Sequence, residues 1–316
     1  MTFIPKVLKS YTSKIKSVFL SVIVIFPLYS TSSYGQVPDH VKEWFPKETL
    51  FHHNVPYAND TLRKHLLDIY VPGNANFNTP VVVWVHGGAW MMNDKYADMG
   101  YMKNTIRSFL EKGYALASID YRHSTTAKFP AQIQDCYEAL EFLHVNAGKY
   151  KMDKKRIALI GFSAGGHLAS LLALSNNNNI TEFYPDKKKT HFQIKAMIDF
   201  YGPSDFMVMT APGDPNMTGD PISTLLGAAP IKRPDISKLA SPVTYVDKND
   251  PPFFIVHGEK DESVPYQQSV LLQSYLNVAG VQNELTIVKD APHYGAMFDS
   301  EEIRTKLFAF LENTLK

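Results

Sequence analysis

Short apolar runs alternate with longer amphipathic stretches from about residue 65 onward. Runs of about 4 to 8 apolar residues between turn signals are typical of buried strands, and apolar positions spaced three or four apart are typical of helices. We expect strands at Leu66–Tyr70, Val81–His86, Ala115–Ile119, Ile157–Phe162, Ala196–Tyr201, Phe253–His257 and Glu284–Val288. We expect helices at Met99–Lys112, Pro130–Ala147, Ala164–Ser175, Tyr266–Ala279 and Glu301–Leu315.

Two of these strands, Val81–Val85 and Ile157–Ile160, carry apolar residues at every position. Strands of this kind are buried on both faces, as in parallel sheets covered by helices. Regular alternation of strands and helices predicts an α/β domain with a mostly parallel sheet. Because no repeat or linker interrupts it, we interpret residues 36–316 as one domain.

Two segments break the alternation. Asn176–Asn179 is polar, and Lys187–Lys189 follows it, so we expect a solvated loop there. Pro203–Pro242 holds seven prolines, which exclude a single long helix. We expect this segment to be a short irregular cap over the sheet, since long excursions of this kind often form lids or binding walls.

The first 35 residues differ from the rest in composition. Four lysines stand in a stretch without acidic residues, an almost wholly apolar run covers Val18–Leu28, and small residues precede Gly35. This order predicts a secretory signal peptide over residues 1–35, and an uncleaved membrane anchor is the alternative. The apolar run is shorter than the roughly 20 residues that a spanning helix needs. We therefore expect a secreted or periplasmic protein that is not bound to a membrane after cleavage.

Composition excludes several classes of protein. Of 316 residues, 45% are apolar and 20% charged, with 32 basic against 31 acidic side chains, which excludes disorder and gives no electrostatic footprint for nucleic acid. Loss of residues 1–35 would leave a formal charge of −3. The single cysteine, Cys136, permits no intramolecular disulfide and is predicted to be a buried core residue of a helix.

Ser163 is the strongest candidate for chemistry. It lies in Gly161-Phe162-Ser163-Ala164-Gly165, between a predicted strand and a predicted helix. A serine on such a tight turn needs small flanking residues, and the following helix N-terminus favours negative charge. We predict that Ser163 is a nucleophile, and the alternative is a helix N-cap whose glycines serve packing.

A serine nucleophile needs a base within hydrogen-bond reach. In one class of hydrolases the order along the chain is serine, acid, histidine, and of the 11 histidines His293 fits that order best. Asp261, in the loop after the strand Phe253–His257, is the predicted acid, and Glu259 and Glu262 are the alternatives.

The other histidines that border predicted strands or turns are expected to be structural, with ring nitrogens bonded to nearby backbone. They are His86, His167 and His257.

The run His86-Gly87-Gly88-Ala89-Trp90 directly follows an apolar strand. Acyl transfer requires amide donors aimed at the developing oxyanion, and glycines let the backbone approach closely. We predict an oxyanion hole made by the amides of Gly88, Ala89 and Ala164, with Trp90 in a substrate-binding wall.

The chain resembles a known family in these motifs: HGGAW, DYRHS with FPA and QDCYEAL, GFSAGGHLAS, HGEKDESVP and APHYG. They are similar to those of the α/β-hydrolase esterases, and most similar to the secreted carbohydrate acetyl and feruloyl esterase branch. The resemblance implies an eight-stranded, mostly parallel sheet with helices on both faces, with Ser163, Asp261 and His293 as the catalytic residues. Lipase-like relatives usually carry a third glycine where this chain has Ala89, which weakens assignment to that branch.

Taken together, these features predict a serine carboxylic ester hydrolase that acts through an acyl-enzyme and needs no metal or organic cofactor. Small esters or esterified plant polysaccharide are the expected substrates. A general short-chain carboxylesterase or lipase-like enzyme, an arylformamidase and a catalytically inactive binding protein are the alternatives. A prolyl oligopeptidase would normally need an additional gating domain, which this chain is too short to hold. The oligomeric state is not predicted.

Overall fold

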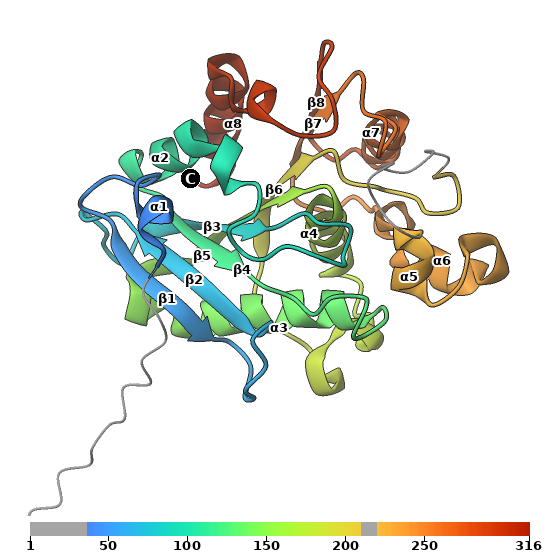
Figure 1. Ribbon diagram of the computed structural model, residues 1–316, viewed down its shortest axis with the longest axis horizontal. Coiled ribbons are helices and arrows are strands. Elements are labelled where there is room, and N and C mark those ends of the chain that lie inside the picture. The colour runs from blue at the N-terminus through green and yellow to red at the C-terminus, as the bar shows by residue number, and fades with distance from the viewer. Residues whose placement is uncertain (1–36, 210–219) are drawn as a thin grey trace, which may run out of the picture. The chain divides into compact units, whose positions relative to one another are not determined.

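The computed structural model describes residues 37–209 and 220–316. The predicted signal peptide, residues 1–35, lies outside the described residues, as does part of the proline-rich segment. The described residues form an α/β domain (Figure 1).

Eight strands form one sheet in the order β1-β2-β4-β3-β5-β6-β7-β8. Strand β2 is antiparallel to both of its neighbours, and all other neighbouring pairs are parallel. The strands are β1 Leu50–Pro56, β2 Leu66–Val71, β3 Thr79–Val85, β4 Ala115–Ile119, β5 Met152–Phe162, β6 Ile194–Phe200, β7 Phe253–Gly258 and β8 Asn283–Val288. The predicted eight-stranded, mostly parallel sheet is confirmed.

The α-helices are α1 Asp39–Lys42, α2 Lys103–Glu111, α3 Ala131–Asn146, α4 Ala164–Ser175, α5 Pro221–Leu226, α6 Pro234–Ala240, α7 Gln267–Ala279 and α8 Glu301–Thr314. Short 3₁₀ turns occupy η1 Met99–Tyr101, η2 Ala147–Tyr150, η3 Thr181–Phe183, η4 Pro185–Lys187, η5 Pro230–Lys232, η6 Pro242–Tyr245 and η7 Ala296–Asp299.

Helices cover both faces of the sheet, as Figure 1 shows. Side chains alternate along a strand, so Val81 and Val83 of β3 pack on one face with α3, α4 and α7. Val82 and Trp84 pack on the other face with α1, α2 and α8. Each central strand is therefore buried on both sides, which explains its continuous apolar sequence.

Strand β1 was absent from the sequence prediction. Its central residues His52, His53 and Asn54 are polar, and the register against β2 shifts between His52 and Val55. A bulged edge strand lacks strict apolar alternation, because only part of it faces the core.

The proline-rich segment is less irregular than expected. Its described part contains α5 and α6, and each begins with a proline at its first helical position, Pro221 and Pro234. Proline is tolerated there because the first amide of a helix has no partner inside the helix. The prolines thus start short helices while still excluding a long one.

The lone cysteine lies in α3 and is fully buried, as predicted. Burial raises the pKa of the Cys136 thiol well above its usual value. The thiol is therefore protonated and packs as a small apolar group.

Candidate active site

Ser163 lies on a sharp turn between β5 and α4. Its backbone has φ 54° and ψ −118°, and its amide donates to the carbonyl of Phe200 at 2.9 Å. A non-glycine residue with a positive φ is strained and persists only when its surroundings hold it. The turn places Ser163 at the carboxyl ends of the parallel strands, immediately before the first residue of α4.

The glycines beside Ser163 have a steric function. A Cβ at Gly161 would lie 2.2 Å from the carbonyl oxygen of Gly165, and a Cβ at Gly165 would lie 2.1 Å from the carbonyl oxygen of Val85. Both contacts involve backbone that no side-chain rotation can relieve. Only glycine lets α4 pack this closely against β3 and β5.

Ser163, His293 and Asp261 come together across the sheet's carboxyl edge. Nε2 of His293 lies 2.8 Å from Oγ of Ser163, and Nδ1 of His293 lies 2.6 Å from Oδ2 of Asp261. Asp261 follows β7 and His293 follows β8, so loops of neighbouring strands supply the acid and the base. The chain order and the spatial order therefore agree.

Charge and hydrogen bonding determine the proton positions in this trio. The carboxylate of Asp261 is fully buried. Burial favours its neutral form, but hydrogen bonds from His257 and His293 outweigh that effect and lower the pKa of Asp261 to about 2. An ionised Asp261 accepts from Nδ1–H of His293, which leaves Nε2 free to accept the hydroxyl proton of Ser163. The alternative acid Glu259 instead accepts from the amide of Asp290 at the surface.

The loop after β3 is shaped to present amides. Gly88, Ala89 and Trp90 all have positive φ values, 119°, 53° and 60°. The carbonyl of Gly88 accepts from the amides of Met91 and Met92, which closes the loop. The amides of Gly88 and Ala89 donate to no other described residue, so they are available to a ligand. The third predicted donor, the amide of Ala164, belongs to the first residue of α4.

Asp98 holds this loop in place, and the sequence analysis missed it. One of its oxygens accepts from the amide of Gly87 at 2.7 Å, and the other accepts from the hydroxyl of Tyr101 at 2.6 Å. Burial raises the pKa of Asp98, against the hydrogen bonds from Tyr101 and Gly87. The hydroxyl of Tyr101 lies 2.7 Å from that of Tyr201, whose ring packs on His293. Asp98 thus connects the amide loop to the surroundings of the base.

Trp90, the predicted wall residue, is buried. Its side chain is only 3% exposed, and its ring packs edge-on against His167 and Phe206. Nε1 of Trp90 donates to Nδ1 of His167 at 3.2 Å. Burial against these two aromatic rings stabilises the side chain. A substrate-binding role for Trp90 stays a prediction.

Two further histidines occupy structural positions. Nε2 of His167 lies 2.7 Å from the carbonyl of Ala240, and burial lowers the pKa of His167 to about 4, so the ring is neutral. His86 bonds the carbonyl of Gly87 through Nδ1 at 2.6 Å. His257 differs, because it contacts Asp261 directly at 3.0 Å.

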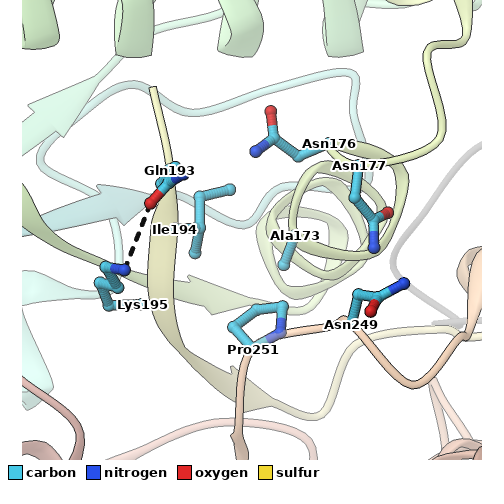
Figure 2. A pocket seen from close by; sticks show the side chains of 8 residues that line it. All are labelled: Ala173, Asn176, Asn177, Gln193, Ile194, Lys195, Asn249 and Pro251. Atoms are coloured by element: carbon cyan, nitrogen blue, oxygen red, sulfur yellow. Dashed lines mark hydrogen bonds between the residues drawn. The ribbon is translucent and has the colours of Figure 1, made fainter. Parts of the chain in front are cut away.

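A separate cavity of about 260 Å³ lies at the amino ends of β6 and β7, opposite the ends that carry the proposed site (Figure 2). Its lining comes from the end of α4, the start of β6 and the loop before β7: Ala173, Asn176, Asn177, Gln193, Ile194, Lys195, Asn249 and Pro251. Since Ser163 precedes the first residue of α4, the length of this helix separates the cavity from the serine.

Among the described residues, no cluster of three or more His, Cys, Asp or Glu side chains is arranged to hold a metal ion. None of the helices in the described ranges is long and apolar enough to span a bilayer.

Comparison with known proteins identifies the family of this chain. Residues 67–276 match the family described as BD-FAE. The chain belongs to the BD-FAE family. The match starts within β2 and ends within α7, so it includes Ser163 and Asp261 and stops short of His293.

Individual relatives of this BD-FAE protein are esterases by name. The "Probable carboxylic ester hydrolase LipM" of Mycobacterium tuberculosis (strain ATCC 25618 / H37Rv) is 34% identical over 60% of this chain and 43% of its own length. The solved structure "Truncated form of carbohydrate esterase from gut microbiota" has a TM-score of 0.75 and 31% identity, covering 84% of this chain and 96% of that one. The "Bifunctional GH43-CE" of Bacteroides eggerthii has a TM-score of 0.74 and 33% identity, covering 84% of this chain and 35% of that one. The chain spans about half the length of the curated relatives it matches.

Proposed function

We propose that this BD-FAE protein is a serine carboxylic ester hydrolase that releases acetyl or feruloyl groups from plant cell-wall polysaccharide. The observation that carries the proposal is the pair of hydrogen-bond distances from Ser163 to His293 and from His293 to Asp261, 2.8 and 2.6 Å. Beside them lie the amides of Gly88 and Ala89, which have no partner among the described residues. The names of the relatives support ester hydrolysis, and two solved carbohydrate esterases above 30% identity support a carbohydrate substrate.

In the proposed mechanism, Oγ of Ser163 attacks the ester carbonyl while Nε2 of His293 takes its proton. Asp261 keeps the imidazole in the tautomer that can do this and stabilises the imidazolium that forms. The proton then passes from His293 to the leaving alcohol, which departs and leaves an acyl-serine. Water, activated by His293, repeats the attack and releases the acid.

The oxyanion formed in each attack needs preorganised donors. We assign that role to the amides of Gly88, Ala89 and Ala164. Removal of one such donor typically lowers the rate by about 10² to 10³. The amides of Gly88 and Ala89 lie on the loop that Asp98 holds, and the amide of Ala164 lies in the first turn of α4, so these backbone donors require no reorganisation during the reaction.

Hydrolysis of p-nitrophenyl acetate by Ser163→Ala and Ser274→Ala tests the catalytic assignment. Ser274 lies exposed on α7, and its hydroxyl donates to the carbonyl of Val270 in the same helix, so its variant is a matched control. We expect Ser163→Ala to lose activity with an unchanged circular dichroism spectrum, and Ser274→Ala to retain it. Activity retained in Ser163→Ala would exclude the assignment.

A substrate panel tests the finer part of the proposal. Acetylated xylan, methyl ferulate and p-nitrophenyl esters of increasing chain length are assayed side by side. Turnover of methyl ferulate requires room for an aromatic acyl group, and release of acetate from xylan requires access to a polymer. Activity confined to p-nitrophenyl esters would favour the alternative, a general short-chain carboxylesterase.

We further propose that the protein acts outside the cytoplasm. The basic and then apolar composition of residues 1–35 supports export, and a polysaccharide substrate would require it. The test is N-terminal sequencing of the protein recovered from the periplasm or medium, which shows whether residues 1–35 have been removed. Recovery of uncleaved protein from the cytoplasm alone would contradict it.

A further inference from the structure

The carboxylate of Asp261 receives more hydrogen bonds than a simple Ser-His-Asp arrangement requires. Its Oδ1 accepts from the amides of Ser263 and Val264 at 2.9 and 2.8 Å. Its Oδ2 accepts from Nδ1 of His293 at 2.6 Å and from Nε2 of His257 at 3.0 Å. Two imidazoles therefore share one carboxylate oxygen.

The second imidazole is fixed on every side. The side chain of His257 is fully buried at the end of β7. Its Nε2 also lies 2.8 Å from the carbonyl of Val264, and its Nδ1 lies 2.7 Å from Oγ of Ser269 on α7. Because a carbonyl and a carboxylate only accept, Nε2 must carry the hydrogen that both share. A neutral ring is then fully satisfied, with Nδ1 accepting from the hydroxyl of Ser269.

The backbone around His257 brings it to the loop that carries the base. Gly258 follows it, and a Cβ there would lie 2.4 Å from the carbonyl oxygen of Pro292 and 2.5 Å from that of Ala291. The amide of Lys260 donates to the carbonyl of Ala291 at 2.9 Å. The turn after β7 is thus pressed against the residues directly before His293.

We propose that His257 is a positioning residue for catalysis, which holds Oδ2 of Asp261 in line with Nδ1 of His293. This inference rests on the proposed ester hydrolase function. The two backbone amides fix Oδ1, but they leave the carboxylate free to turn about the axis through that oxygen. The hydrogen from Nε2 of His257 fixes the second oxygen. The same hydrogen bond draws negative charge away from the oxygen that faces His293. The carboxylate therefore stabilises the protonated imidazole of His293 less strongly than it would without His257.

Other charged and titratable groups face His257 and enter any dependence on pH. Asp199 of β6 interacts with it through charge, and burial raises the pKa of Asp199 to about 6. The ring of Tyr201 lies 6.3 Å from the ring of His257, centroid to centroid. Asp199→Asn therefore serves as a background in which the second carboxylate is absent.

His257→Leu and His257→Gln form the decisive pair of variants. Leucine cannot donate, whereas the amide nitrogen of glutamine can reach the place of Nε2. With p-nitrophenyl acetate, we expect His257→Leu to lower kcat by about tenfold or more, below the about 10⁴-fold effect of removing the acid's function. KM stays within about twofold, since no substrate contact is lost. His257→Gln restores most of kcat.

The pH profile separates positioning from support of the fold. Without the donor, Asp261 holds a proton on His293 more strongly, so the acid limb of kcat/KM moves to higher pH in His257→Leu, also in the Asp199→Asn background. His257→Gln leaves the limb in place. Equal losses in both variants with an unmoved acid limb would assign His257 to fold stability alone and overturn the proposal.

Two measurements keep the proposal testable if His257→Leu unfolds or if the activity assignment fails. Ser269→Ala removes the partner of Nδ1, and we expect a smaller loss of kcat and a smaller shift in the same directions. In proton NMR, the imidazole hydrogen of the 2.6 Å bond between His293 and Asp261 gives a downfield signal that needs no substrate. We expect the chemical shift of that signal to change in His257→Leu. It should not change in the control His52→Leu, because the ring of His52 packs on Tyr150 and not on Asp261. An unmoved signal in both would overturn the proposal whether or not the protein hydrolyses esters.

Discussion

Replacement of Gly165 by alanine tests whether close backbone packing builds the site. The added Cβ would lie 2.1 Å from the carbonyl oxygen of Val85 and 2.4 Å from that of His86, where contacts under 3.0 Å are essentially never seen. Helix α4 and strand β3 must therefore separate by about 1 Å, because a packed core has no free volume to absorb the methyl group. Overpacking of this kind costs about 3 kcal/mol.

The same separation acts on catalysis. Ser163 and Ala164 move with α4, whereas Gly88 and Ala89 move with the loop after β3, so the nucleophile and two of the donors lose their relative placement. A misplacement of about 1 Å can lower the rate by on the order of 10². Urea denaturation followed by circular dichroism, together with kcat on p-nitrophenyl acetate, measures both effects.

Gly148→Ala is the matched control. Nothing lies within 4 Å of a Cβ at this position, and its backbone is not in the left-handed region. We expect its unfolding free energy to stay within about 0.5 kcal/mol of the wild type, with unchanged kcat. If Gly165→Ala matched Gly148→Ala in both measurements, the steric reasoning would be refuted.

Three further predictions follow from buried polar groups. Asp98→Ala removes the acceptor of the Gly87 amide and of the Tyr101 hydroxyl, so it should lower the unfolding free energy by about 2 kcal/mol and also reduce kcat. Asp98→Asn keeps an acceptor and should keep most of the stability and most of kcat. Equal losses in the two variants, in urea denaturation and esterase assays, would contradict this. Because burial raises the pKa of Cys136, iodoacetamide should label it only in denaturant, and mass spectrometry showing rapid labelling of the native chain would count against the buried thiol. Burial raises the pKa of Asp250 to about 7, above its unfolded value. The contribution of this side chain to stability is therefore present at low pH and is lost as pH rises from about 4 to about 7. Asp250→Asn should raise the thermal midpoint more at pH 8 than at pH 5, and the reverse order would refute the assigned burial.

Local signals made much of the fold predictable from sequence. The apolar runs of β3 and β5 identify buried parallel strands without reference to any partner. Gly161 is equally local, because the steric conflict it avoids is with Gly165 of the same turn, whereas Gly165 avoids the backbone of Val85 on the distant strand β3. The two apolar runs and Gly161 are encoded where they occur.

Features that depend on pairing between distant segments were not predictable in this way. Strand β1 is recognised only by its partner β2, since its own residues are largely polar. The role of Asp98 depends on a loop conformation that returns it to the amide of Gly87. The spacing of His257 and Asp261, four residues apart across a glycine, was visible in the sequence, but nothing in it indicated that the ring turns toward the carboxylate.

The sheet order determines which strands the proposed site depends on. The proposed nucleophile Ser163 follows β5 in the middle of the sheet, and the proposed oxyanion loop follows its neighbour β3. The proposed acid and base follow β7 and β8 at one edge. The arrangement of the proposed catalytic residues is therefore complete only when β8 is paired with β7. Under the proposed function, a variant that separates β8 from β7 would displace His293 and lose turnover even where β3, β5 and α4 keep their packing.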